Sequence, residues 1–202
     1  MGISSPTRGY GILEGFLAEK RCKMANKLIS PDLWYGRILD IGCSSHPLFL
    51  MNTPFSEKYG LDKLIHETHK KEYISQNIIL DNYDIETAGR MPFEEDYFGV
   101  VIMLAVFEHL EPEKLMGILS EIHRILKPGG MYILTTPAGW TGWLLKLMSM
   151  LRLVSPHEID EHKDSYSPNK ILRLLKMRGF AKEKIRYGYF EMFVNIWVTA
   201  TK

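Results

Sequence analysis

Short apolar segments alternate with segments of helical spacing from Ile38 onwards, and no internal repeat interrupts the alternation. Five of the apolar segments have the length of a strand, at residues 37–42, 57–61, 77–83, 98–104 and 130–136. Each is mostly apolar throughout, which is typical of strands covered by helices on both faces. The pattern therefore predicts an α/β protein with a parallel sheet.

Two of the remaining segments have helical spacing. The one before the last of these strands carries apolar residues at Leu115, Ile118, Leu119, Ile122 and Leu126, and we expect the Lys-Pro-Gly-Gly of residues 127–130 to end this helix and turn the chain. The other segment spans residues 11–29. Its apolar residues are expected to pack on the sheet or to close over a ligand, and they are Leu13, Phe16, Leu17, Met24, Leu28 and Ile29.

The C-terminal region predicts a different strand arrangement. From Phe180 we expect two strands separated by a break around Gly188, close enough to pair as an antiparallel hairpin. The whole pattern predicts a doubly wound, seven-stranded sheet that is mostly parallel and ends in an antiparallel hairpin. We expect a single domain over residues 1–202, because 202 residues with 46% hydrophobic content suit one sizeable core.

Composition narrows the class of protein. No window approaches the roughly 20 apolar residues that cross a bilayer, and residues 1–11 lack the apolar core of a signal peptide, so we expect a cytoplasmic protein. Cys22 and Cys43 lie in no Cys/His spacing that predicts a metal site or a disulfide framework. We expect two reduced thiols and no metal.

The formal net charge of +1 conceals an uneven distribution of charge along the chain. Residues 1–37 carry 6 basic and 3 acidic side chains, residues 38–139 carry 8 and 15, and residues 140–202 carry 11 and 6. Basic ends around an acidic middle suit an anionic substrate or a membrane surface. For any single lysine, a solvated helix face remains the simpler explanation.

Aspartates stand at the ends of the first three expected strands, as Asp40, Asp62 and Asp84. The carboxyl ends of parallel strands border the ligand crevice of such a sheet, and Gly42 would let the backbone pass close to a bound molecule. Acids there suit a cationic ligand better than a dinucleotide, whose pyrophosphate is anionic. Asp62 could accept ribose hydroxyls and Asp84 an exocyclic amine such as adenine N6, although turns and helix N-caps also favour aspartate.

At these residues the sequence resembles the class I S-adenosylmethionine-dependent methyltransferases, in particular their small-molecule, type 11-like branch. The resemblance rests on ILDIGCSS at 38–45, GLD at 60–62, YDIETAGRMPFEEDYFGVVIMLAVFEHL at 83–110 and EIHRILKPGGMYILTTP at 121–137. It covers residues 37–137 closely and the rest loosely. It implies a Rossmann-like fold and S-adenosyl-L-methionine as cofactor, a ligand with a sulfonium, an ammonium and no phosphate.

The resemblance also implies a role for each matching residue. Those around the cofactor are Asp40, Gly42 and Ser44 at the methionine part, Asp62 at the ribose, Asp84 and Ile85 at the adenine, and Leu104 and Ala105 at the sulfonium. Ser44 and His46 stand where the family often has glycine, and Gly99 where it often has aspartate. These departures leave a non-catalytic, methyltransferase-like binding module as an alternative.

The same resemblance divides the chain into four parts. Residues 1–36 would form an N-terminal helical arm, 37–137 the cofactor-binding core, 138–168 a substrate lid, and 169–202 a C-terminal helix and hairpin.

The acceptor side is expected beyond the fourth strand and in the lid. Methyl transfer depends mainly on holding the acceptor close and aligned, and an oxygen acceptor also benefits from a base. The candidates are His109, His162 and Tyr166, of which we favour His162. Residues 140–155 carry apolar side chains on almost every face of an expected helix, which suits a core helix, a roof over an apolar acceptor or a helix on a bilayer surface.

We therefore expect a small-molecule or lipid-like acceptor, with peripheral membrane contact through residues 140–155 as one version of this hypothesis. Methylation of a protein or of nucleic acid is an alternative. Nucleic acid is disfavoured because the fourth strand ends in MLAVFEHL, which lacks both the Asn/Asp-Pro-Pro-aromatic turn and the Pro-Cys nucleophile of base methylation. The sequence does not indicate an oligomeric state.

Overall fold

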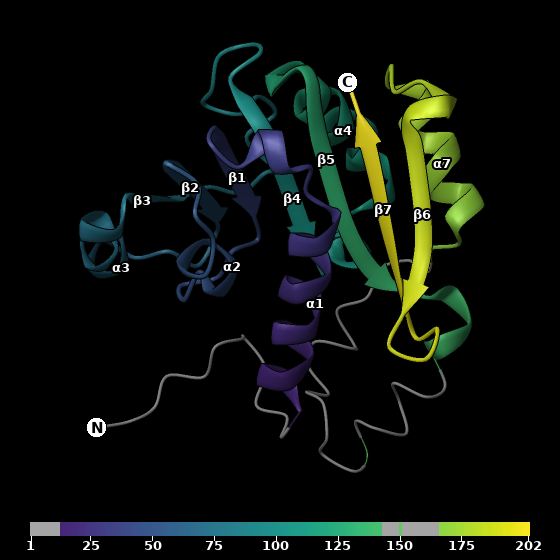
Figure 1. The fold of residues 1–202 in the computed structure, drawn as a ribbon, viewed down its shortest axis with the longest axis horizontal. Coiled ribbons are helices and arrows are strands. Elements are labelled where there is room, and N and C mark those ends of the chain that lie inside the picture. Colours follow the sequence, from purple (N-terminus) through teal and green to yellow (C-terminus); the bar gives the residue numbers. More distant parts are fainter. Residues whose placement is uncertain (1–12, 143–149, 151–165) are drawn as a thin grey trace.

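The computed structural model describes residues 13–142, 150 and 166–202. The seven strands of this described part form one sheet in the order β3-β2-β1-β4-β5-β7-β6 (Figure 1). Their bounds are β1 Arg37–Ile41, β2 Glu57–Asp62, β3 Ile78–Asn82, β4 Phe98–Leu104, β5 Leu126–Pro137, β6 Ile185–Phe190 and β7 Asn195–Thr201. The first five strands are parallel, and β7 runs antiparallel between β5 and β6. The predicted doubly wound, Rossmann-like sheet with a C-terminal hairpin is confirmed.

Helices pack on both faces of the sheet, as the unbroken apolar strands require. On one face, α1 (Glu14–Leu28) and α2 (Leu48–Met51) share a buried cluster with β1, β3 and β4, and α3 (Glu67–Glu72) follows β2. On the other face, α4 (Pro112–Ile125) and α7 (Pro168–Met177) share the larger cluster. Short 3-10 turns complete the described part as η1 Pro31–Leu33, η2 Ile74–Gln76, η3 Phe107–His109, η4 Gly139–Thr141 and η5 Lys182–Lys184.

The helix α1 packs on the sheet, but through smaller residues than the sequence pattern indicated. Ala18, Ala25 and the following Ile29 are buried, whereas Phe16 is 55% exposed. Alanines let the helix approach the sheet closely. The predicted apolar face is therefore wrong at Phe16, whose ring instead lies under the ammonium of Lys20, 5.0 Å from its centroid.

The chain passes directly from α4 into β5 without the expected turn. Leu126 pairs with Phe98, but the next pairs are Val100 with Met131 and onwards, so the residues between them form an irregular bulge. Gly129 has φ +79°, and a Cβ on Gly130 would lie 2.8 Å from the carbonyl oxygen of Lys127. The helix thus ends at Ile125, Leu126 belongs to the strand rather than to the predicted helix, and the Lys-Pro-Gly-Gly stretch bulges from the strand instead of turning the chain.

The hairpin turns at residues 191–194, and the break predicted around Gly188 is wrong. Gly188 lies inside β6 and pairs with Trp197 of β7. A Cβ on Gly188 would lie 2.6 Å from Cζ2 of the Trp197 indole. Glycine is needed here because a rigid ring from the neighbouring strand fills the space of a side chain.

Replacing Gly188 by valine is therefore expected to lower the free energy of unfolding by roughly 1–3 kcal/mol, the usual effect of extra methyl groups in a filled site. Denaturant unfolding measures this change. Gly117→Ala in α4 is the control, because no atom lies within 4 Å of a Cβ there and alanine favours a helix by about 1 kcal/mol. Wild-type stability of Gly188→Val would contradict the packing argument.

Candidate functional site

Two aspartates lie buried at the carboxyl ends of adjacent parallel strands. Asp40 pairs with Gly60 of β2 on one side and Ile102 of β4 on the other, and Asp62 is the last residue of β2. Asp40 is only 5% exposed and Asp62 only 2% exposed. The parallel register brings both carboxyl groups to the edge of the sheet where the sequence predicted a ligand crevice.

Burial raises the pKa of the Asp40 carboxyl well above its ordinary value, and the nearby negative charge of Asp62 raises it further. The cause is that a low-dielectric surrounding disfavours the charged form of an acid, as does a like charge beside it. Asp40 is thus an acid held in an environment that lacks a compensating cation within the described residues. A cation arriving at this edge would favour its ionised form.

Asp62 fixes the loop that follows β1. Its Oδ2 accepts a hydrogen bond from the backbone N–H of Ser44 at 3.0 Å, and its Oδ1 accepts one from the N–H of Leu64 at 2.9 Å. Ser44 has φ +62°, a conformation that ordinary residues adopt rarely. The carboxylate of Asp62 therefore holds the loop in the shape that carries Gly42 and Ser44 beside the strand ends.

Gly42 is required by packing against the loop after β4. It has φ +80°, and a Cβ on it would lie 2.3 Å from Cγ2 of Val106. Val106 was not among the predicted site residues, and its only signal in the sequence is an apolar, β-branched side chain shortly after a buried strand. The contact brings the loops after β1 and β4 together.

Asp84 stabilises a turn just beyond β3. Its Oδ1 accepts a hydrogen bond from the N–H of Glu86 at 2.9 Å, and its carbonyl oxygen accepts from the N–H of Ala88 at 3.1 Å. Asp84 and Ile85 are half-buried. Glu86 in turn accepts from the N–H of Glu111 through Oε1 at 2.7 Å, which joins this turn to the start of α4. Asp84 thus stabilises a turn, which was one of the two roles considered for it. Its other role, binding an exocyclic amine of a ligand, stays a prediction.

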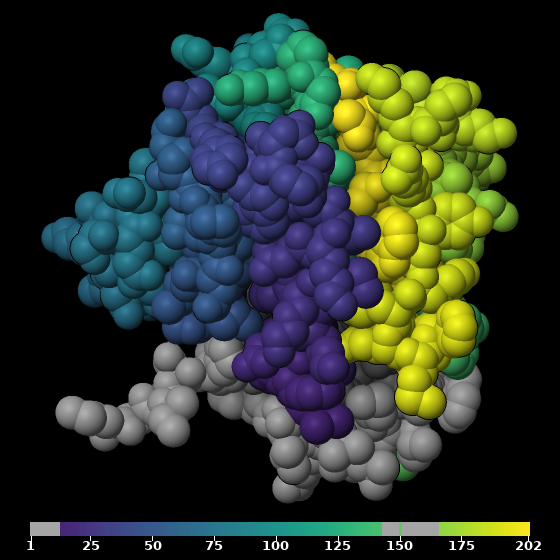
Figure 2. Space-filling model, viewed as in Figure 1, coloured from purple at the N-terminus to yellow at the C-terminus, as the bar shows by residue number. Residues whose placement is uncertain are grey.

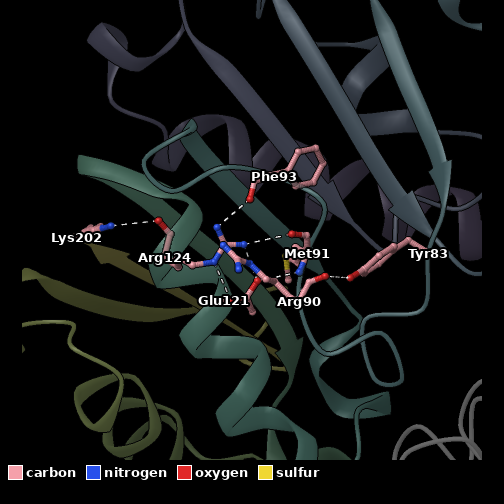
Figure 3. Close-up of polar contacts among 7 residues, drawn as sticks. All are labelled: Tyr83, Arg90, Met91, Phe93, Glu121, Arg124 and Lys202. Atoms are coloured by element: carbon pink, nitrogen blue, oxygen red, sulfur yellow. Dashed lines mark hydrogen bonds and ion pairs between the residues drawn. The ribbon is translucent and has the colours of Figure 1, made fainter.

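A partly buried ion pair anchors the rest of the segment between β3 and β4 (Figure 3). The guanidinium of Arg124 donates to both carboxylate oxygens of Glu121, at 2.8 and 2.7 Å, and to the carbonyl oxygens of Phe93 and Met91, at 2.8 and 3.2 Å. Glu121 also accepts from the N–H of Met91 at 2.8 Å. Bidentate pairing of this kind is geometrically specific, and it holds the segment that carries Asp84 against α4.

The loop after β4 has a second unusual backbone conformation. Ala105 has φ +54°, and its N–H donates to the carbonyl oxygen of Thr135 at 3.0 Å and to its Oγ1 at 3.2 Å. Thr135 is fully buried in β5. Leu104 and Ala105 are half-buried and lie at the same sheet edge as Asp40. Thr135 supports them and was absent from the sequence predictions.

The candidate acceptor residues lie at the ends of β4 and β5. His109 is half-buried in η3. Tyr166 is fully buried, packs edge-on against Phe107 of η3 with ring centroids 4.7 Å apart, and forms an isolated bridge with Ala138. The structure brings these two residues to one region. His162 lies outside the described residues, as does most of segment 140–155.

The departures from the family pattern have different surroundings. Ser44 contacts a carboxylate, because its N–H donates to Asp62, whereas His46 contacts Tyr73 and Gly99 lies at the far end of a strand. His46 Nδ1 lies 3.0 Å from the hydroxyl oxygen of Tyr73, and the two rings meet edge-on. Gly99 is at the start of β4, whereas the ligand edge is at its other end, Leu104. At about 3.3 Å per strand residue, the two ends are well separated.

Asp40→Asn is expected to stabilise the protein at neutral pH. A carboxyl with a raised pKa contributes stability that is present below its unfolded pKa, about 4, and that is lost as the pH rises towards the raised value. The stability difference between variant and wild type should therefore grow with pH, by about 1.4 kcal/mol for each unit of pKa rise.

Denaturant unfolding at a series of pH values measures this difference. Asp81→Asn is the control, because Asp81 is 49% exposed in its side chain and pairs with Lys70 at 2.8 Å, so its removal should bring no stabilisation. A pH-independent difference for Asp40→Asn would argue against the proposed burial effect.

Comparison with known proteins agrees with this geometry. Residues 39–134 match the family model described as a methyltransferase domain. An uncharacterised methyltransferase from Synechocystis sp. is 36% identical over 59 residues, which is 28% of this chain and 28% of that protein. The aligned part thus spans little more than a quarter of the curated relative.

Solved structures share the fold over nearly the whole chain. A methyltransferase from Archaeoglobus fulgidus has a TM-score of 0.67 at 16% identity, covering 93% of this chain and 94% of its own. One from Mesorhizobium loti has a TM-score of 0.65 at 16% identity, covering 90% and 98%. Both are named as S-adenosylmethionine-dependent enzymes.

The fold and the family match point to one class of protein. Residues 39–134, just under half of the chain, are similar to the methyltransferase-domain family, and the fold is the one found in solved structures of the S-adenosylmethionine-dependent methyltransferase class. S-adenosylmethionine is the methyl donor of this class. In the part of the chain that the structure describes, no helix combines the length and apolar character of a membrane span.

Proposed function

We propose that this protein transfers a methyl group from S-adenosylmethionine to a small-molecule or lipid-like acceptor by in-line displacement. The observation that carries the proposal is the pair of buried carboxyl groups, Asp40 and Asp62, at the ends of adjacent parallel strands. Burying like charges together costs free energy. A cationic ligand at this edge would offset that cost, which gives the arrangement a functional reason.

The donor set fits the cofactor. Asp40 would face the ammonium and sulfonium end, and Asp62 would accept from the ribose hydroxyls, because a carboxylate is an acceptor only. Gly42 and Ser44 would form the loop between them. Asp84 and Ile85 would hold the adenine, in the segment that Arg124 anchors.

When bound, the cofactor supplies a methyl group on an already activated carbon. The protein's own contribution is then to hold the acceptor in line and to exclude water. Leu104 and Ala105 would border the reacting methyl group, with Ala105 held by Thr135. His162 remains the favoured base for an oxygen acceptor, and His109 and Tyr166 are the other candidates.

A lipid-like acceptor is favoured by an apolar side chain that faces solvent just beyond the carboxyl end of β5. Trp140 in η4 is 51% exposed. Apolar residues at such positions are typical of contact with an apolar ligand or surface.

Asp62→Ala is expected to weaken S-adenosylmethionine binding by roughly 1–3 kcal/mol, the usual effect of losing charged hydrogen bonds. Isothermal titration calorimetry measures it, with unfolding of the same variant recorded in parallel because Asp62 also holds the Ser44 loop. Asp81→Asn is the control and should bind normally.

Unchanged affinity of Asp62→Ala would refute the ribose assignment. A wild-type protein that gives no heat with S-adenosylmethionine would instead support the non-catalytic binding module. NAD should give no heat whether or not S-adenosylmethionine binds, because acids at the strand ends do not suit the anionic pyrophosphate of a dinucleotide.

The class of acceptor can be tested with S-adenosylmethionine that carries a labelled methyl group, incubated with the protein and a cell extract. We expect the label in the organic-solvent fraction, because the acceptor is lipid-like. Label in the aqueous small-molecule fraction would indicate a polar acceptor, and label in precipitated protein or nucleic acid would support the macromolecular alternatives. The Asp62→Ala variant is the control for background transfer.

A further inference from the structure

The tip of the β6–β7 hairpin exposes large apolar side chains. Met192 is 90% exposed and Phe193 is 67% exposed, although both are residue types that usually lie inside a protein. The ring of Tyr189 in β6, itself 41% exposed, lies beside Phe193 with ring centroids 5.9 Å apart. The tip thus carries an aromatic and methionine surface that the described core does not use.

The backbone of the tip directs these side chains outward. Glu191, Met192 and Phe193 have φ values of +51°, +55° and +69° in succession. Residues other than glycine adopt such conformations rarely. Local bonds hold the turn, because the N–H of Val194 donates to the carbonyl oxygen of Glu191 at 3.1 Å and the side-chain amide of Asn195 donates to the Glu191 carboxylate. The turn therefore presents Met192 and Phe193 to solvent in a defined conformation.

Two further exposed aromatic residues lie at the same end of the molecule. Trp140 is in η4, which is joined to the hairpin by the bond from the N–H of Ala138 to the carbonyl oxygen of Val194, at 2.8 Å. Phe16 is in the first turn of α1, and Figure 2 shows α1 and the hairpin side by side, with the start of α1 and the hairpin tip towards the same end. We call Phe16, Trp140, Met192 and Phe193 the apolar rim.

Cations flank the apolar rim. The ammonium of Lys20 lies 5.0 Å from the centre of the Phe16 ring, and the positive charges of Lys20 and Arg21 act on the carboxyl of Glu191 at the base of the hairpin tip. Residues 140–202 carry 11 basic and 6 acidic side chains. Apolar and aromatic residues bordered by Lys and Arg are the combination that binds the interface of an anionic membrane.

We propose that the apolar rim docks this end of the protein on a bilayer surface that contains anionic lipids. The proposal rests on the lipid-like acceptor of the proposed function, because the rim lies at the carboxyl ends of β1, β4 and β5, where the acceptor would enter. Met192 and Phe193 would enter the headgroup region, Trp140 and Phe16 would lie beside them, and Lys20 and Arg21 would meet the lipid phosphates. Docking would then present the site to an acceptor held in the membrane.

Vesicle co-flotation tests the proposal with the whole 202-residue chain. Wild type is expected to float with vesicles of phosphatidylcholine and phosphatidylglycerol, and less with phosphatidylcholine alone or at high salt, because screening weakens the contribution of Lys20 and Arg21. Met192→Ser combined with Phe193→Ser should reduce partitioning at least about tenfold, since two large apolar side chains are removed from the interface.

A matched double variant controls for the loss of exposed apolar surface. Tyr35 and Met177 are 88% and 60% exposed and lie outside the rim, so Tyr35→Ser combined with Met177→Ser should float like wild type. Equal flotation of the two double variants would overturn the proposal, as would a wild type that stays with the soluble protein.

Two parallel measurements separate this proposal from its alternatives. Calorimetry with S-adenosylmethionine on the same samples tests the proposed function independently. A protein that binds the cofactor but does not bind vesicles would overturn the membrane-docking proposal and leave the proposed function standing. Light scattering across a concentration series reports self-association. A dimer that the Met192→Ser/Phe193→Ser variant abolishes, without vesicle binding by the wild type, would assign the rim to a second copy of the chain and overturn the membrane surface.

Discussion

The candidate site depends on the hydrogen bonds that the carboxylate of Asp62 accepts. This carboxylate accepts backbone hydrogen bonds from Ser44 and Leu64, so one side chain ties the loop after β1 to the end of β2. These bonds also keep the negative charge of Asp62 close to the buried Asp40, which raises the pKa of Asp40. One side chain therefore sets both the loop conformation and the charge at the strand ends in the absence of a ligand.

Separate anchors hold the other parts of the crevice. The Glu121–Arg124 pair fixes the segment between β3 and β4 from α4, and Thr135 fixes Ala105 from β5. Each anchor lies on a helix or strand rather than on the loop that it holds. Loops supported in this way can present ligand-binding groups with little rearrangement, which lowers the entropy cost of binding.

The same edge of the sheet also carries the apolar rim. Parallel strands bring the ends of β1, β4 and β5 together, and the antiparallel β7 returns the chain so that the hairpin tip lies beside η4. Acidic groups therefore lie inside this end, with exposed aromatic residues and cations around it. A cationic cofactor and an apolar acceptor would approach one end of the molecule through surfaces of different character.

The family match and the fold agree with what the sequence indicated, because both depend on local signals. Short apolar runs determine buried parallel strands, and the aspartates at their ends follow from chain order alone. The resemblance carried by the stretches around Asp40, Asp62 and Asp84 likewise depends on adjacent residues. The roles of these residues towards a cofactor stay predictions, although the structure buries Asp40 and Asp62 side by side.

Only the tertiary structure decided how distant residues share space. Gly188 faces Trp197, Gly42 faces Val106, and His46 lies against Tyr73, and no local pattern specifies such pairs. The tertiary structure also decided which side of α1 faces the sheet. The helix packs through its small residues Ala18 and Ala25, because the surface opposite leaves room only for a close approach. The sequence by itself thus determined the strands and the acids at their ends, whereas packing between strands and loops decided which glycines, turns and side chains hold them in place.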